Sequence, residues 1–170
     1  MKSARGFTLI EMVAVMMIIG VLAAAIAPMA LSSLRAYDAT LNSVVTLDKL
    51  RYATERLARE LRAVNYNGAS FDFTSMSTTA PVFIKVDGVT VTVAATASTV
   101  TLGYSTPTLI PAGAPVLTDQ LSALSFAYFD QDGVSTASSA AVRYVEITLT
   151  LSQGAQTYSQ RTRVALRDRA

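Results

Sequence analysis

Hydrophobic and polar positions divide the chain into an apolar run, an amphipathic segment and a region of alternating positions. From Met12 to Leu34 no residue carries a charge, and about 20 apolar residues let a helix cross a bilayer. From Leu34 to Val64 apolar residues recur at steps mostly of three or four, which is typical of an amphipathic helix. We therefore predict one long helix from Phe7 to about Asn65, bent or broken near Pro28, because an interior proline removes a backbone hydrogen bond.

The amphipathic half of this helix has an apolar stripe that another surface must bury. The chain's own C-terminal region is the first candidate for that surface. A neighbouring subunit that covers part of the stripe is the alternative. Opposite charges four residues apart on the polar face predict three stabilising pairs. These pairs are Arg51/Glu55, Glu55/Arg59 and Arg56/Glu60.

Beyond Gly68 the period of the pattern falls to two, which predicts β-strands. Residues 82–93 hold two β-branched runs around Asp87-Gly88 and predict a hairpin. The segment that ends at Pro115 contains Pro107, Pro111 and Gly113 and predicts a loop. Further strands are predicted near 99–104, 121–129, 142–151 and 157–167, with turns at 130–133 and 153–154. A long helix followed by an antiparallel sheet is an α+β fold.

The N-terminus places Lys2 and Arg5 before the apolar run, and a carboxylate, Glu11, at its edge. Basic residues ahead of a span hold that end in the cytoplasm, so the C-terminal region is expected on the far side of the membrane. A secretory signal peptide is one interpretation, but the apolar run exceeds the usual 7–15 residues or so. Its small-residue cleavage site would also lie directly before Pro28. An unprocessed single-span anchor is a second interpretation, and it leaves Glu11 unexplained.

A third interpretation rests on residues 6–11, Gly-Phe-Thr-Leu-Ile-Glu, followed by the apolar helix. This arrangement resembles the processing motif of type IV prepilins and type II secretion pseudopilins. The resemblance implies that a membrane prepilin peptidase cuts between Gly6 and Phe7 and then methylates the Phe7 amine. It also implies that Glu11 pairs with the terminal ammonium of a neighbouring subunit and sets the register of assembly. In assembled members of the family, the stretch between residues placed like Gly20 and Pro28 often loses its helical structure.

The resemblance implies a division of the chain and a set of partners. Residues 1–6 are the leader, 7–34 the transmembrane half of the helix, 35–65 its amphipathic half and 69–170 a β-rich head. Expected partners are the peptidase, other pilin or pseudopilin subunits, an inner-membrane assembly platform and membrane lipid. The expected location is the bacterial inner membrane, with the head in the periplasm, and then a pilus or pseudopilus. The head resembles minor pilins and J-type minor pseudopilins, including a minor prepilin of mannose-sensitive haemagglutinin pili.

The residue composition limits the kinds of catalytic and binding site that the chain can form. The chain has no cysteine and no histidine, which removes disulfides, thiol nucleophiles and the commonest general base. We find no nucleophile elbow, phosphate loop or carboxylate constellation, so we expect no enzymatic activity, no cofactor and no metal. Lys2 and Arg5 account for the whole net charge of +2. The processed chain is therefore balanced, and bulk attraction to nucleic acid is not indicated.

Three features of the head keep a binding function open as the alternative. In this alternative the chain is a tip subunit whose head contacts DNA, a surface or a secreted protein. Asp130, Asp132 and Gly133 would suit either a calcium loop or an ordinary turn. Basic residues of the head would suit either contacts with DNA or another subunit, or a solvated strand face. Aromatic residues would suit either stacking on a ligand or packing in the core. The basic residues are Arg161, Arg163, Arg167 and Arg169, and the aromatic residues are Tyr66, Tyr128 and Phe129.

Overall fold

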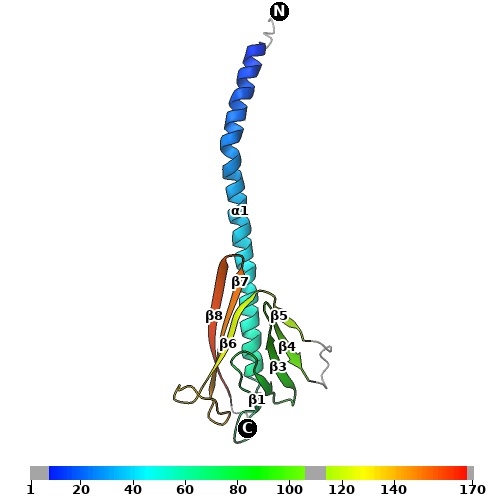
Figure 1. Ribbon diagram of the computed structural model, residues 1–170, viewed down its shortest axis with the longest axis vertical. Coiled ribbons are helices and arrows are strands. Elements are labelled where there is room, and N and C mark those ends of the chain that lie inside the picture. Colours follow the sequence, from blue (N-terminus) through cyan, green and yellow to red (C-terminus); the bar gives the residue numbers. More distant parts are fainter. Residues whose placement is uncertain (1–7, 106–113, 168–170) are drawn as a thin grey trace, which may run out of the picture. The chain divides into compact units, whose positions relative to one another are not determined.

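The computed structural model describes residues 8–105 and 114–167. Its one long helix, α1, runs from Leu9 to Leu61 over 53 residues. The chain separates into two compact units, residues 1–42 and 43–170. The second unit contains the C-terminal part of α1 and every strand, and Figure 1 shows the two sheets on either side of this part of the helix. The predicted α+β fold is confirmed.

Two antiparallel sheets form the head, where the pattern predicted one. The first sheet has the order β1-β2-β3-β4-β5, and the second has the order β6-β7-β8. The strands of the first sheet are β1 (Phe73–Ser75), β2 (Val82–Ile84), β3 (Thr90–Ala95), β4 (Val100–Tyr104) and β5 (Val116–Thr118). The strands of the second sheet are β6 (Leu121–Phe129), β7 (Tyr144–Gln153) and β8 (Gln156–Ala165).

Local sequence explains most of these boundaries. Gly88 lies at φ 80° in the turn between β2 and β3, and Gly154 lies at φ 60° between β7 and β8. Both turns need a backbone conformation that side chains disfavour, so the glycines end the strands. The helix ends at Leu61, four residues before the predicted end. Val64, just beyond it, pairs instead with Lys85 in an isolated β-bridge. Strand pairing therefore competes successfully with the helical continuation.

A single hydrophobic core joins the helix to both sheets. Alternate residues of β7, namely Val145, Ile147, Leu149 and Leu151, are fully buried, as the period of two predicted. Leu50, Leu57 and Leu61 of α1 belong to the same cluster as Phe83 of the first sheet and Phe126 of the second.

A charged network adds a polar attachment between α1 and the first sheet. The Glu60 side chain is almost fully buried, and its Oε1 lies 2.7 Å from the Arg56 guanidinium. The Lys85 ammonium lies 3.5 Å from the other carboxylate oxygen. The Tyr104 hydroxyl donates a hydrogen bond to Glu60 at 2.9 Å and accepts one from Arg56 at 2.9 Å. A buried carboxylate persists only with such partners. Of the three charge pairs predicted along the helix, only Arg56/Glu60 forms among the described residues.

Candidate assembly and processing site

The first part of α1 has the composition and length of a membrane span. Its most apolar 18-residue window has a mean hydropathy of 2.6, and none of that window is buried within the protein. Glu11 lies in the first turn of the same helix. A helix of this kind near the N-terminus fits a single-pass membrane anchor. The anchor begins just beyond the predicted cleavage point.

Glu11 and Thr8 form a reciprocal cap at the start of α1. The backbone N–H and the hydroxyl of Thr8 each donate to Glu11 Oε2 over 3.4 Å. In return, the backbone N–H of Glu11 donates to Thr8 Oγ1 over 3.4 Å. This is a capping box, in which a threonine and the glutamate three residues later satisfy free N–H groups of the first turn. The sequence analysis missed this role of Glu11, although the Thr-x-x-Glu spacing is its usual signal.

Gly20 and Pro28 both lie inside the assigned helix. A Cβ added at Gly20 would meet no atom within 4 Å, so packing within this chain does not require glycine there. Just after Pro28, the hydroxyls of Ser32 and Ser33 both donate to the carbonyl of Met29, at 2.9 and 3.0 Å. Hydroxyl groups that bond back to the helix backbone favour bending. The loosening of this stretch on assembly stays a prediction.

Four predicted site residues lie outside the described residues. They are Lys2 and Arg5 of the leader, together with Gly6 and Phe7 at the cleavage point. Thr8 and Glu11, which complete the motif, are described, and both are exposed. Processing at Gly6, methylation of Phe7 and pairing of Glu11 with an ammonium remain predictions.

The amphipathic stripe of α1 is covered along only part of its length. The head buries Leu50, Leu57 and Leu61, as expected. Earlier apolar residues remain exposed, with about half of the side chain accessible even at the best covered. These residues are Leu34, Tyr37, Leu41, Val44 and Leu47. The expectation that the chain's own head covers the stripe is therefore confirmed only from Leu50 onward.

The acidic turn of the head follows ordinary turn chemistry. Asp130 Oδ1 accepts hydrogen bonds from the backbone N–H groups of Asp132 at 3.0 Å and Val134 at 2.8 Å. Gly133 takes φ 80° in the same turn. No group of three or more metal-ligating side chains occurs among the described residues. Asp130 thus uses its carboxylate to shape the turn.

Two of the C-terminal arginines surround a carboxylate. Arg161 and Arg163 on β8 lie 2.6 and 3.2 Å from the two oxygens of Glu146 on β7. The hydrogen bond from Arg161 lowers the pKa of Glu146 below its ordinary value, against the opposing effect of desolvation. The Arg163 guanidinium also lies 4.4 Å from the centre of the Phe129 ring. This face of the sheet therefore carries much less free positive charge than the sequence suggests.

Aromatic residues that were considered as ligand platforms take part in packing. Tyr128 is buried, and its hydroxyl donates to the Ser77 carbonyl at 2.8 Å. Its burial raises the pKa of the phenol well above the ordinary value. Tyr66 lies against Phe71, with ring centres 5.0 Å apart. The core-packing interpretation of Tyr66 and Tyr128 is confirmed.

Comparison with known proteins places the N-terminal segment in a described family. The model of the prokaryotic N-terminal methylation motif matches residues 1–27. A search of curated proteins found no match to the chain. The match covers the leader, Glu11, Gly20 and most of the apolar helix, and it agrees with the resemblance drawn from residues 6–11. This motif, with a membrane-length helix behind it and an α+β head, supports a relationship of the chain to the type IV prepilins and pseudopilins.

Proposed function

We propose that the chain is a minor subunit of a type IV pilus or type II secretion pseudopilus. A prepilin peptidase cuts it after Gly6 and methylates Phe7, and the mature subunit assembles through α1 with other subunits. Before assembly, the helix anchors the chain in the bacterial inner membrane with the head in the periplasm. This role is mechanical and needs no catalytic residue. The methylation motif at residues 1–27 is the observation that carries the proposal.

Exposed apolar surface on α1 gives this proposal further support. The segment from Leu34 to Leu47 presents six exposed large apolar side chains. An exposed apolar stripe of this length is rare on a soluble monomer and marks an interaction surface. In the proposed filament, helices of neighbouring subunits cover it. The minor identity rests on the resemblance of the head alone.

Replacement of Gly6 by valine tests the proposed processing. A branched side chain beside the scissile bond is expected to block the peptidase, so the chain keeps its six-residue leader. Membrane insertion should be unchanged, because the apolar run is intact. Intact mass of the membrane-extracted chain, from cells with and without an active prepilin peptidase, gives the readout. Ala4→Val adds bulk elsewhere in the leader and serves as the matched control. Removal of the leader from the Gly6→Val chain would contradict cleavage at this bond.

A further inference from the structure

Strand β8 presents a free edge to solvent. The register between β7 and β8 runs without a shift from Gln153↔Gln156 to Tyr144↔Ala165. At the opposite side of this sheet, β6 is bonded to loops through Leu121 N–H to Ser98 and Phe126 N–H to Thr78. No such bond leaves the backbone of β8 among residues 8–105 and 114–167. A ten-residue edge with no bulge and no proline is a ready template for another strand.

The geometry of the hairpin identifies the free backbone groups of β8. Paired residues of an antiparallel ladder alternate between hydrogen-bonded and non-hydrogen-bonded pairs. The turn at Gly154–Ala155 has two residues, so the flanking pair Gln153 and Gln156 is hydrogen-bonded. Counting from that pair, the N–H and C=O groups of Ser159, Arg161 and Arg163 point away from β7. An added strand would find these groups unpaired.

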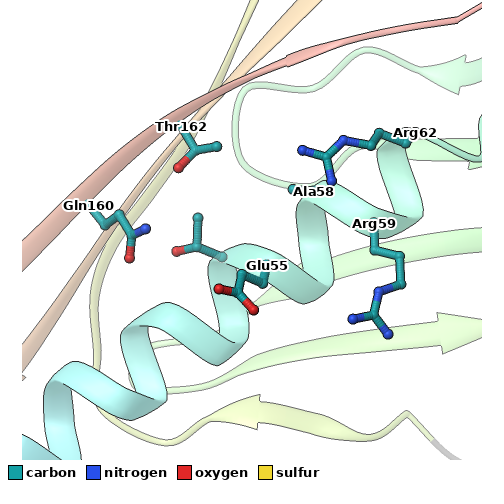
Figure 2. A pocket seen from close by; sticks show the side chains of 7 residues that line it. Glu55, Ala58, Arg59, Arg62, Gln160 and Thr162 are labelled. Atoms are coloured by element: carbon teal, nitrogen blue, oxygen red, sulfur yellow. The ribbon is translucent and has the colours of Figure 1, made fainter.

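A groove lies between this edge and helix α1. Two cavities of about 330 and 280 Å³ share Gln160 of β8. On the helix they extend from Leu47 to Arg62. Figure 2 shows Gln160 and Thr162 directed toward the helix across the larger cavity. Side chains from one face of a strand added to β8 would enter this groove, because alternate residues of a strand point to the same side.

The end of the groove near the C-terminus of α1 is basic. Arg59 and Arg62 line the larger cavity, and Glu55 is the one acidic residue among its described lining residues (Figure 2). Neither arginine forms an ion pair within the described part of the chain, whereas Arg161 and Arg163 are both held by Glu146. Carboxylates are the side chains that guanidinium groups bind most strongly. The charge at this end of the groove thus complements acidic residues on the inward face of an added strand.

We propose that the head, together with the C-terminal part of α1, binds an extended acidic segment of a partner protein, which adds to β8 as a further strand. The backbone of the segment pairs with Ser159, Arg161 and Arg163, and its carboxylates meet Arg59 and Arg62. A strand fits better than a nucleic acid because the edge offers backbone donors and acceptors at the spacing of a β-ladder. The binding is a property of the second unit, Ser43–Ala170, and does not depend on cleavage at Gly6.

A labelled ten-residue peptide that alternates threonine and glutamate tests the proposal on the full chain in non-ionic detergent micelles. Its glutamates lie on one face of a strand. Fluorescence anisotropy should show saturable binding. The same peptide N-methylated at every residue, which lacks N–H donors on both edges, should not bind. A threonine–glutamine peptide should bind at least about tenfold more weakly, because it lacks the charge. Equal binding of the N-methylated peptide would exclude strand addition.

Variants of the protein distinguish the contribution of the β8 edge to peptide binding from that of the arginine charge. Ser159→Pro removes an outward N–H and should abolish binding, whereas Ser159→Ala keeps the N–H and should bind normally. The double change Arg59→Gln with Arg62→Gln should weaken binding at least about tenfold. Arg35→Gln, on an exposed residue outside the groove, should have no effect. If the arginine pair proves dispensable, the acidic specificity is wrong.

Two other occupants would produce different results. A labelled ten-nucleotide oligothymidylate that binds where the peptide does not would overturn the proposal in favour of nucleic acid. Analytical ultracentrifugation of the chain in micelles tests whether a second copy of the chain pairs with the β8 edge. Self-association that Ser159→Pro abolishes, without peptide binding to the unmodified chain, would assign the edge to contacts between copies. The N-methylated peptide keeps the test decisive if Ser159→Pro fails to fold.

Discussion

Replacing Glu11 with alanine is expected to leave membrane insertion intact and to reduce filament assembly at least about tenfold. Alanine makes the apolar segment more hydrophobic, so insertion does not suffer. Assembly suffers because the ammonium of an incoming subunit loses its carboxylate partner in apolar surroundings. The measurements are carbonate extraction of membranes for insertion, and recovery of sheared filaments for assembly.

Glu11→Gln distinguishes the two roles that Glu11 could have. Glutamine at the third helical position still supports a capping box with Thr8, but it has no charge. If pairing with an ammonium matters, the glutamine chain should assemble as poorly as the alanine chain. If the cap at the start of the helix were the whole role of Glu11, the glutamine chain would assemble normally. Normal assembly of the Glu11→Ala chain would exclude both roles.

Replacing Phe126 with alanine is expected to lower the free energy of unfolding of the head by about 3–5 kcal/mol. Phe126 on β6 is 2% exposed and belongs to the core that joins both sheets to the helix. The change removes apolar contacts and leaves a cavity, because the surrounding strands are held by their ladders. Most domains are stable by about 5–15 kcal/mol, so much of the stability of the head would be lost.

Tyr52→Ala is the matched control for this substitution. Tyr52 is also aromatic but is 61% exposed on α1, and its removal should change stability by less than about 0.5 kcal/mol. Urea-dependent proteolysis of the full chain in micelles measures both effects on the same protein. A loss below about 1 kcal/mol at Phe126 would mean that the core is less tightly packed than its burial indicates.

The sequence predicted well those strands and turns whose apolar residues repeat at a regular spacing. The strand at 121–129 has the predicted bounds, and the hairpin around Asp87-Gly88 forms as expected. Such segments are long enough for alternation to stand out, and their glycines mark the turns. Strands β1 and β5 have three residues each. An alternation cannot be recognised over three residues. Strand β2 is equally short, but the Asp87-Gly88 turn marked its hairpin, whereas β1 and β5 were missed.

Contacts between distant residues could not be predicted from local pattern. The Glu60 carboxylate meets Tyr104, 44 residues away, and Glu146 meets Arg161 across a ladder. Their positions become neighbours only after the sheets pack and the strand register is set. For the same reason, the local pattern did not reveal that Glu146 of β7 is buried. The two arginines above it provide that cover.

The processing motif is a different case, because its information is local. Gly6, Phe7 and Glu11 stand at short fixed spacings, so sequence alone was enough to draw the resemblance that the family match supports. The capping box with Thr8 is equally local, but it shares Glu11 with the processing motif. A residue can serve both its own helix and a neighbouring subunit. The glutamine variant is informative for that reason.

Mass spectrometry of the mature N-terminus tests the central claim most directly. The chain is purified from membranes of cells that contain a prepilin peptidase, and its N-terminal peptide is sequenced. The account predicts that the chain begins at N-methylated Phe7. A chain that begins at Pro28, as after signal-peptide cleavage, or one that retains residues 1–6, would contradict it.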